Sequence, residues 1–260
     1  MEIHKIRLIA IASGLAALLC ISAVSRAENN ESFDFFQRVR DGDLDKVRQA
    51  IQNGANVNED QNRTTALLIA SAHGYNDIAD LLLENGAHVD CRGGHEQTPL
   101  HVGAQKGHAE IVQMLLEKHA KINSRMIGGQ TPLYLACQEG HNTVVKLLVK
   151  NDADVNLITN QGFSPLYVAA LFGHLETVRL LIENHANPNQ QAEGGLTPLH
   201  IASLKGYTEI VRTLVQKGAD ISVKTDLGQT PLDAAKAGGH KETVSFLESI
   251  GDKDQTSQRH

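Results

Sequence analysis

Apolar residues recur in short clusters at helical spacing over most of the chain. In residues 98–130, the first cluster predicts a short helix that ends near Gly107, and its members are Leu100, Val102 and Ala104. The second cluster predicts another helix, and its members are Ile111, Val112, Leu115 and Leu116. A polar stretch that contains glycine then runs to Gln130. The pattern therefore predicts a helix, a turn, a second helix and a hairpin-like loop.

This unit recurs with a period of 33 residues, and each copy begins with a tetrapeptide of the type Thr-Pro-Leu-x, with alanine in place of proline in the first copy and serine in place of threonine in the fourth. The six copies begin at Thr65, Thr98, Thr131, Ser164, Thr197 and Thr230. The hydroxyl residue can cap the free N–H groups of a helix start, and proline suits the first helical position. Because a fixed period of this length indicates stacked supersecondary units, we predict a solenoid with an extended surface.

The terminal repeats differ from the internal ones. Residues 33–64 keep the second half of the unit but lack the tetrapeptide, so we predict about seven repeats with a divergent first one. Two neighbouring positions late in the first helix carry small residues in internal repeats. Arg38 occupies the earlier position in the first repeat, and Lys236 occupies the later position in the last repeat. We infer that the earlier position faces the preceding repeat and the later position the following repeat. Arg38 and Lys236 then face water, as solubility of a solenoid requires, and we expect an array complete at both ends.

The repeat unit resembles the ankyrin repeat. The resemblance rests on the tetrapeptide Thr-Pro-Leu-His at 98–101 and 197–200 and on the 33-residue period, and it covers about 220 residues. It implies an all-α solenoid of about seven helix-turn-helix repeats joined by hairpin-like loops. It also implies a concave face, formed by the loop tips and first helices, that binds another protein.

The first 27 residues have the three parts of a secretory signal peptide. Lys5 and Arg7 precede an uncharged run over residues 8–24, and Ser25-Arg26-Ala27 offers a cleavage point after Ala27. The expected organisation is a signal peptide (1–27), a short linker (28–32), the array (33–250) and a polar disordered tail (251–260). We therefore expect a periplasmic or secreted protein. The alternative is a membrane-tethered scaffold that retains residues 8–24 as an anchor, although a run of 17 residues is short for a bilayer.

Charge and cysteine content narrow the partner classes. Loss of residues 1–27 removes three basic groups and one acidic group, so the net charge of −6 becomes −8. An acidic chain without a basic run is not expected to hold nucleic acid or, once the signal is cleaved, a membrane by charge. Cys91 and Cys137 lie more than one repeat apart, so we expect no disulfide between them. We expect a monomer.

The histidines occupy fixed places in the repeat, which indicates structural roles. Four of them follow the glycine that ends a first helix, and these are His108, His141, His174 and His240. His119 and His185 replace a glycine at the end of a second helix, where a left-handed backbone is favoured. Neither the spacing of a zinc site nor a catalytic motif is present. We therefore predict no metal ligands, no cofactor, no catalytic residues and no enzymatic activity.

Positions that the repeat leaves free turn apolar in the fifth and sixth repeats. An exposed apolar cluster with aromatic anchors is typical of a protein-binding site. The candidate partner-binding residues are Tyr134, Phe163, Tyr167, Leu171, Phe172, Leu196 and Leu204. Apolar loop residues accompany them, namely Met126, Ile127, Leu157, Ile158 and Leu227. The alternative is that some of these side chains pack beneath the loops.

Overall fold

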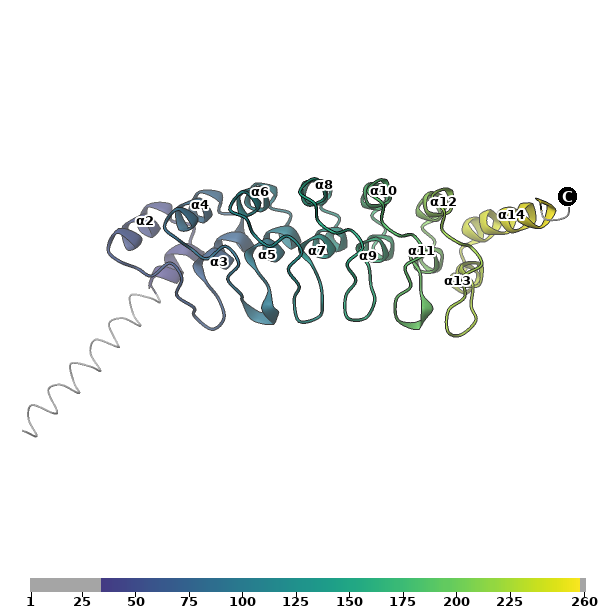
Figure 1. The fold of residues 1–260 in the computed structure, drawn as a ribbon, viewed down its shortest axis with the longest axis horizontal. Helices are drawn as coiled ribbons and strands as arrows, with labels where there is room; N and C mark the ends of the chain where they lie inside the picture. Colours follow the sequence, from purple (N-terminus) through teal and green to yellow (C-terminus); the bar gives the residue numbers. More distant parts are fainter. Residues whose placement is uncertain (1–33, 258–260) are drawn as a thin grey trace, which may run out of the picture. The chain divides into compact units, whose positions relative to one another are not determined.

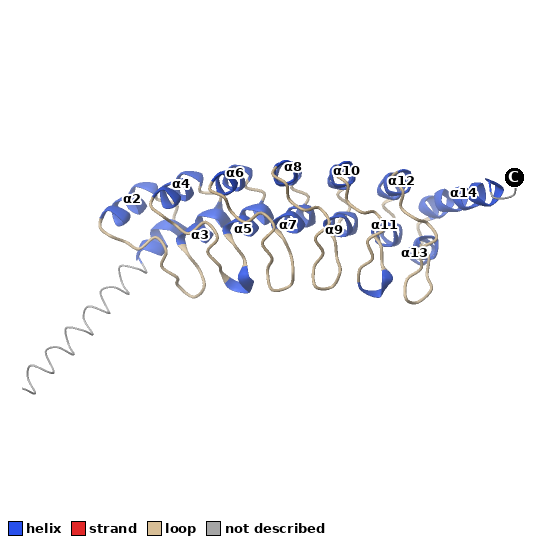
Figure 2. Ribbon diagram, in the orientation of Figure 1, coloured by secondary structure: helices blue, strands red, loops and turns tan. Residues whose placement is uncertain are grey.

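The computed structural model describes residues 34–257 (Figure 1). The expected signal peptide, the linker 28–32 and residues 258–260 lie outside this part of the chain. Across the described range the elements are helices, turns and loops, without strands (Figure 2). The chain divides after His88 into two compact units. Their repeats have the predicted helix-turn-helix form, so the all-helical fold class is confirmed.

The first unit contains the divergent repeat and the one that follows it. Its helices are a segment over residues 34–40, α2 (Leu44–Gln52), α3 (Ala66–His73) and α4 (Asn76–Glu84). Phe35 and Phe36 are buried in the first repeat, where other repeats carry the tetrapeptide. The Tyr75 hydroxyl donates to the Arg40 carbonyl at 3.3 Å and so joins the two repeats.

The second unit contains five repeats in two layers of helices (Figure 2). One layer consists of α5 (Pro99–Lys106), α7 (Pro132–Glu139), α9 (Pro165–Leu171), α11 (Pro198–Lys205) and α13 (Pro231–Gly238). The other layer consists of α6 (Ala109–Glu117), α8 (Asn142–Lys150), α10 (Leu175–Glu183), α12 (Thr208–Gln216) and α14 (Lys241–Ser257). Within each layer every helix contacts the next one. The loops, which include the short 3₁₀ turns η1 (Gly94–Glu96) and η2 (Glu193–Gly195), extend beyond the odd-numbered helices (Figure 1).

The tetrapeptide and the glycines position each odd-numbered helix. The Thr131 hydroxyl accepts a hydrogen bond from the Tyr134 backbone N–H at 3.2 Å and caps α7. Gly140 ends α7 with φ of 71°, a left-handed conformation that glycine adopts without steric cost. The His174 ring covers this glycine so closely that an added Cβ would lie 2.6 Å from Nδ1. Glycine is therefore required at this turn by both backbone and packing.

Histidines after these glycines join successive repeats, as the sequence predicts. Nε2 of His141 lies 3.0 Å from the Gln105 carbonyl oxygen, and Nε2 of His174 lies 2.9 Å from that of Gln138. His240 repeats the contact with the Leu204 carbonyl at 3.0 Å. Each bond satisfies a carbonyl near the end of the first helix in the preceding repeat.

Small side chains line the contacts between the odd-numbered helices. Ala136, Ala169 and Ala170 are all fully buried. Cys137 shares this environment, and burial raises the pKa of its thiol well above the usual range. No disulfide joins Cys137 to Cys91 in the described part of the chain. The inert, buried thiol acts as a small apolar side chain.

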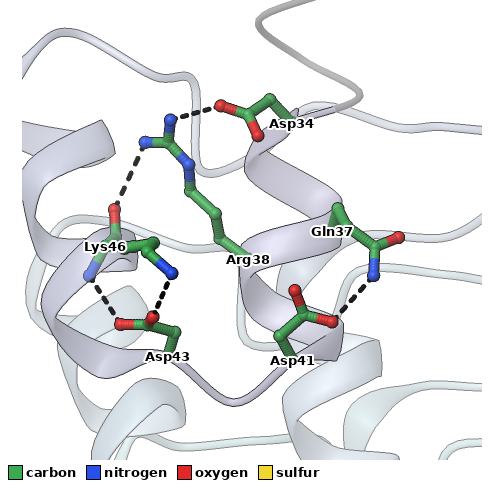
Figure 3. Close-up of polar contacts among 6 residues, drawn as sticks. All are labelled: Asp34, Gln37, Arg38, Asp41, Asp43 and Lys46. Carbon is green, nitrogen blue, oxygen red and sulfur yellow. Dashed lines mark hydrogen bonds and ion pairs between the residues drawn. The ribbon is translucent and has the colours of Figure 1, made fainter.

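Polar networks replace apolar packing at the ends of the array. In the first repeat the Arg38 guanidinium pairs with Asp34 and points toward the Lys46 carbonyl (Figure 3). Nearby, the hydrogen bond from the Lys46 side chain holds the pKa of Asp43 below its usual value. In the last repeat the Lys236 ammonium lies 2.9 Å from Glu248, and both side chains are half exposed. The predicted exposure of Lys236 beside a fully buried Ala235 is confirmed.

The last helix extends into the segment for which the sequence predicts a disordered tail. Helix α14 continues beyond Gly251 to Ser257, so most of residues 251–260 is helical. The segment 252–257 contains no proline and directly follows an established helix. Extending a helix requires only one further residue to be ordered for each hydrogen bond gained, whereas starting one is costly.

His119 and His185 both adopt the left-handed conformation that the sequence predicts, with φ of 63° and 66°. Replacement of either residue by glycine should raise the free energy of unfolding by about 0.5 kcal/mol, because relief of the side-chain clash exceeds the added entropy of the unfolded chain. Denaturant midpoints of the two variants would measure this gain. Lys118→Gly is the matched control, because Lys118 has φ of −88° and should lose stability on the same change.

Candidate functional site

The seven candidate residues lie on or beside α7, α9 and α11, at different depths. Tyr134 and Tyr167 are largely buried, with 9% and 6% of their surface exposed. Half-buried positions are occupied by Phe163, Leu171 and Leu196. Phe172 and Leu204 are exposed, at 51% and 41%. The structure therefore divides the predicted set into two largely buried tyrosines, three residues at the surface boundary and two exposed apolar residues.

Three of these residues form one row across the fifth repeat. The rings of Phe163 and Tyr167 are in contact, with centroids 4.9 Å apart and planes tilted by 31°. Leu171 lies four residues after Tyr167 on α9 and therefore on the same side of that helix. The row connects the loop before α9 with the end of α9.

Phe172 ends α9 and stacks on His174, with ring centroids 6.4 Å apart. Leu204 lies near the end of α11, which packs directly against α9. Tyr207 covers the intervening Gly173, where an added Cβ would lie 2.9 Å from the tyrosine Cζ. We call Phe172, Leu204 and Tyr207 the Phe172 cluster. It is an apolar surface shared by the fifth and sixth repeats.

Tyr207, which is 36% exposed, is not among the residues predicted from the sequence. A signal for it was available in the 33-residue period, because Tyr207 occupies the position of His108, His141, His174 and His240. Histidine at this position predicts a structural role, whereas tyrosine adds an aromatic ring that can bind a partner. Its exposure depends on the neighbouring repeat and is visible only in the folded chain.

The apolar loop residues lie apart from one another. Ile127 and Leu227 are 62% and 86% exposed, but they belong to loops three repeats apart. Hydrogen bonds hold successive loops together, as from the Ile127 N–H to the His95 carbonyl at 3.1 Å and from the Asp226 N–H to the Gly194 carbonyl at 3.0 Å. The structure therefore does not bring Ile127 and Leu227 into one patch.

Exposed residues of opposite charge end the two helices that pack against α9, namely Glu139 on α7 and Lys205 on α11. Lys205 is the only Lys, Arg, Asp or Glu residue on α9 and α11, and it forms no ion pair within the described chain. Desolvation raises the pKa of Tyr134 and Tyr167, and the neighbouring Tyr167 raises that of Tyr134 further. Both phenols are therefore protonated near neutral pH and can donate hydrogen bonds.

The motif histidines are part of the scaffold. Nδ1 of His101 accepts from the Thr98 N–H at 3.2 Å, and Nε2 lies 3.2 Å from the Gln130 carbonyl. Burial lowers the pKa of His101 to about 4, so the ring is neutral near pH 7 and Nε2 carries its proton. His200 has the same arrangement with Thr197 and Gln229.

Other kinds of site find little support in the part of the chain that is described. Within residues 34–257 no group of three or more His, Cys, Asp or Glu side chains could hold a metal ion. In the same range no helix combines the length and apolar character needed to span a bilayer. A shallow cavity of about 300 Å³ lies in the last repeat, between Ile221, Leu232 and Leu247, apart from the Phe172 cluster.

Comparison with known families agrees with this architecture. A family model for ankyrin repeats in three copies matches residues 35–126 and 124–192, and one for ankyrin repeats in many copies matches residues 181–235. Neither describes an enzyme, and ankyrin repeats generally mediate interactions between proteins. A search of curated proteins gave no match. The matched segments cover most of the sequence and coincide with the observed helix pairs, so the chain belongs to the ankyrin-repeat family.

Proposed function

We propose that this chain is a non-enzymatic binding module that holds a partner protein on the surface of its fifth and sixth repeats. The observation that carries the proposal is the exposure of Phe172 and Leu204 on neighbouring helices. Exposed apolar clusters of this kind mark interaction sites, and aromatic residues are frequent anchors in them. The half-buried Phe163, Leu171 and Leu196 lie on or beside α9 and α11 and extend this surface.

The proposal is tested with variants that change this surface. Leu171→Asp and Phe172→Ser should each weaken partner binding at least about 30-fold, because loss of a central anchor costs about 2 kcal/mol or more. Affinity capture with the mature chain would supply the partner, and calorimetry with the purified partner would give the affinities. Circular dichroism should show an unchanged fold, because Phe172 is half exposed and Leu171 lies at the helix end.

The matched controls are Gln105→Ser and Lys106→Ser, which occupy the equivalent positions on α5. These positions carry no apolar cluster, so binding should change little. Stronger loss of binding in these controls than in the Phe172 variant would contradict the proposed surface. A sharp drop in the melting temperature of Phe172→Ser would assign Phe172 to the core instead.

We further propose that the module is exported to the periplasm or out of the cell and acts as a monomer. Lys5 and Arg7, the uncharged run 8–24 and the small residues before Glu28 support cleavage of a signal peptide. The alternative is a tethered scaffold anchored by residues 8–24. Mass spectrometry of the mature protein distinguishes them, because export predicts a start at Glu28 and an anchor predicts an intact N-terminal segment.

A further inference from the structure

Four repeats carry an asparagine directly after their second helix. Asn85, Asn151 and Asn184 each use the side-chain Nδ2 to donate a hydrogen bond to the backbone carbonyl four residues earlier, at 2.8 Å, 2.9 Å and 2.8 Å. Asn53 stands at the same position after α2, but its carboxamide has no hydrogen-bond partner among the described residues. Asn53 therefore differs from the other three because its own helix does not hold its side chain.

The residue that follows each asparagine determines its chemistry. Asn53 and Asn85 are followed by glycine and then alanine, whereas Asn151 precedes aspartate and Asn184 precedes histidine. In an Asn-Gly pair the asparagine side chain can react with the backbone nitrogen of the next residue, because glycine has no Cβ to hinder the approach. The chain contains two such pairs, and the structure distinguishes them.

The backbone surroundings of the two pairs are alike. The asparagine and the glycine of each pair are exposed, and a Cβ added at Gly54 or Gly86 would meet no atom within 4 Å. Both glycines are left-handed, with φ of 96° and 83°. In both turns the glycine N–H donates to the carbonyl three residues earlier, at 3.0 Å and 3.1 Å. The main local difference is therefore the side-chain hydrogen bond that Asn85 makes and Asn53 lacks.

The position of Asn53 in the array adds to this difference. Helix α2 belongs to the first repeat and packs on α4 of the second. Repeats at the end of a solenoid have fewer neighbours and open more readily than internal ones. Opening of the last turn of α2 frees the Gly54 nitrogen from the Ile51 carbonyl, and the unrestrained Asn53 side chain then reaches it. At Asn85 the bond from the carboxamide must break as well.

We propose that Asn53 is a site of spontaneous deamidation, with water as the co-reactant. The Gly54 nitrogen forms a bond to Cγ of Asn53, the Cγ–Nδ2 bond breaks, and Nδ2 leaves as ammonia with the proton of the Gly54 nitrogen. Water then opens the cyclic imide. Opening at Cγ gives aspartate, whereas opening at the backbone carbonyl carbon gives isoaspartate, in which the chain continues through the side chain.

The product changes the turn that ends α2. One carboxylate is added, so the net charge of −6 becomes −7, and this carboxylate lies at the negative end of the helix dipole. In isoaspartate the backbone is also longer by one methylene group. The extra length disrupts the hydrogen bonds that Gly54 and Ala55 donate to carbonyls of α2, each at 3.0 Å, which close the helix end. Deamidation therefore destabilises the first repeat.

The test follows both Asn-Gly pairs in the same protein. The purified protein is incubated at mildly alkaline pH and digested, and mass spectrometry measures deamidation in the peptides that contain Asn53 and Asn85. Methylation by a protein isoaspartate methyltransferase measures isoaspartate separately. A parallel incubation in guanidinium chloride is the matched control, because the unfolded chain retains the sequence Asn-Gly-Ala at both sites but none of the structure.

Asn53 should deamidate about three- to tenfold faster than Asn85 in the folded protein, the factor that corresponds to one hydrogen bond. The two rates should agree in guanidinium chloride. Asn53→Gln should abolish the reaction at this position and leave that at Asn85 unchanged, because glutamine would have to form a larger ring. The deamidated form, separated by anion exchange, should melt at a lower temperature than the intact protein.

Equal rates at the two sites in the folded protein, or a faster reaction at Asn85, would overturn the inference. A preference for Asn53 that persists unchanged in guanidinium chloride would also overturn it, because the flanking residues and not the fold would then be the cause. The inference does not rest on the proposed function, so neither result affects the partner-binding surface.

Discussion

Replacement of Ala169 by arginine should lower the free energy of unfolding by about 4 kcal/mol, through overpacking and burial of an unpaired charge. Ala169 is fully buried on α9, which packs between α7 and α11. A long side chain at this position would force the helices apart, because interiors of this density contain no free space for it. Chemical denaturation followed by circular dichroism would measure the loss.

The last repeat supplies a matched comparison for this prediction. Ala235 is fully buried, so Ala235→Arg should cause a loss similar to that of Ala169→Arg. Lys236, one residue further, is exposed and pairs with Glu248, so Lys236→Glu should cost less than about 1 kcal/mol, the range of a surface ion pair. Equal losses for the two changes would contradict the assignment of one position to the preceding repeat and the other to solvent.

Acidification should destabilise the array well before the carboxylates titrate. The pKa of His101 is lowered to about 4 in the folded protein, chiefly by burial, whereas the ordinary value is 6.5. The unfolded chain therefore binds a proton in this interval that the folded chain does not. Stability from the neutral ring is fully present above pH 6.5 and falls as the pH drops toward 4, by about 3 kcal/mol in total.

Burial of the His101 ring is the main cause, and protonation of Nδ1 would also break the hydrogen bond that it accepts from the Thr98 N–H. Unfolding free energies at pH 7 and pH 4.5 would measure the effect. His101→Tyr is the matched variant, because tyrosine occupies this position in two other repeats. It should remove most of the dependence, and burial of His200 should supply a further part in the same direction. An unchanged slope in His101→Tyr would assign the acid sensitivity to other groups.

Local chemistry was sufficient to predict the repeat architecture. The hydroxyl and proline of the tetrapeptide specify where each first helix begins, and glycine specifies where it ends, because these effects depend on the backbone within a few residues. The same locality explains why the left-handed conformations of His119 and His185 were predictable. The extension of α14 to Ser257 was not predictable in this way, because the polar composition of the segment suggests disorder.

The exposed surface was decided by tertiary packing. Tyr134 lies on α7 and Phe172 ends α9, and both are aromatic. Tyr134 is nevertheless largely buried, whereas Phe172 is half exposed. The Tyr207 ring lies over Gly173 of the preceding repeat and remains 36% exposed. Sequence periodicity therefore predicts which residues share a face of their own helix. How far each side chain emerges depends on the volume that neighbouring repeats occupy, which is a property of the stacked helices.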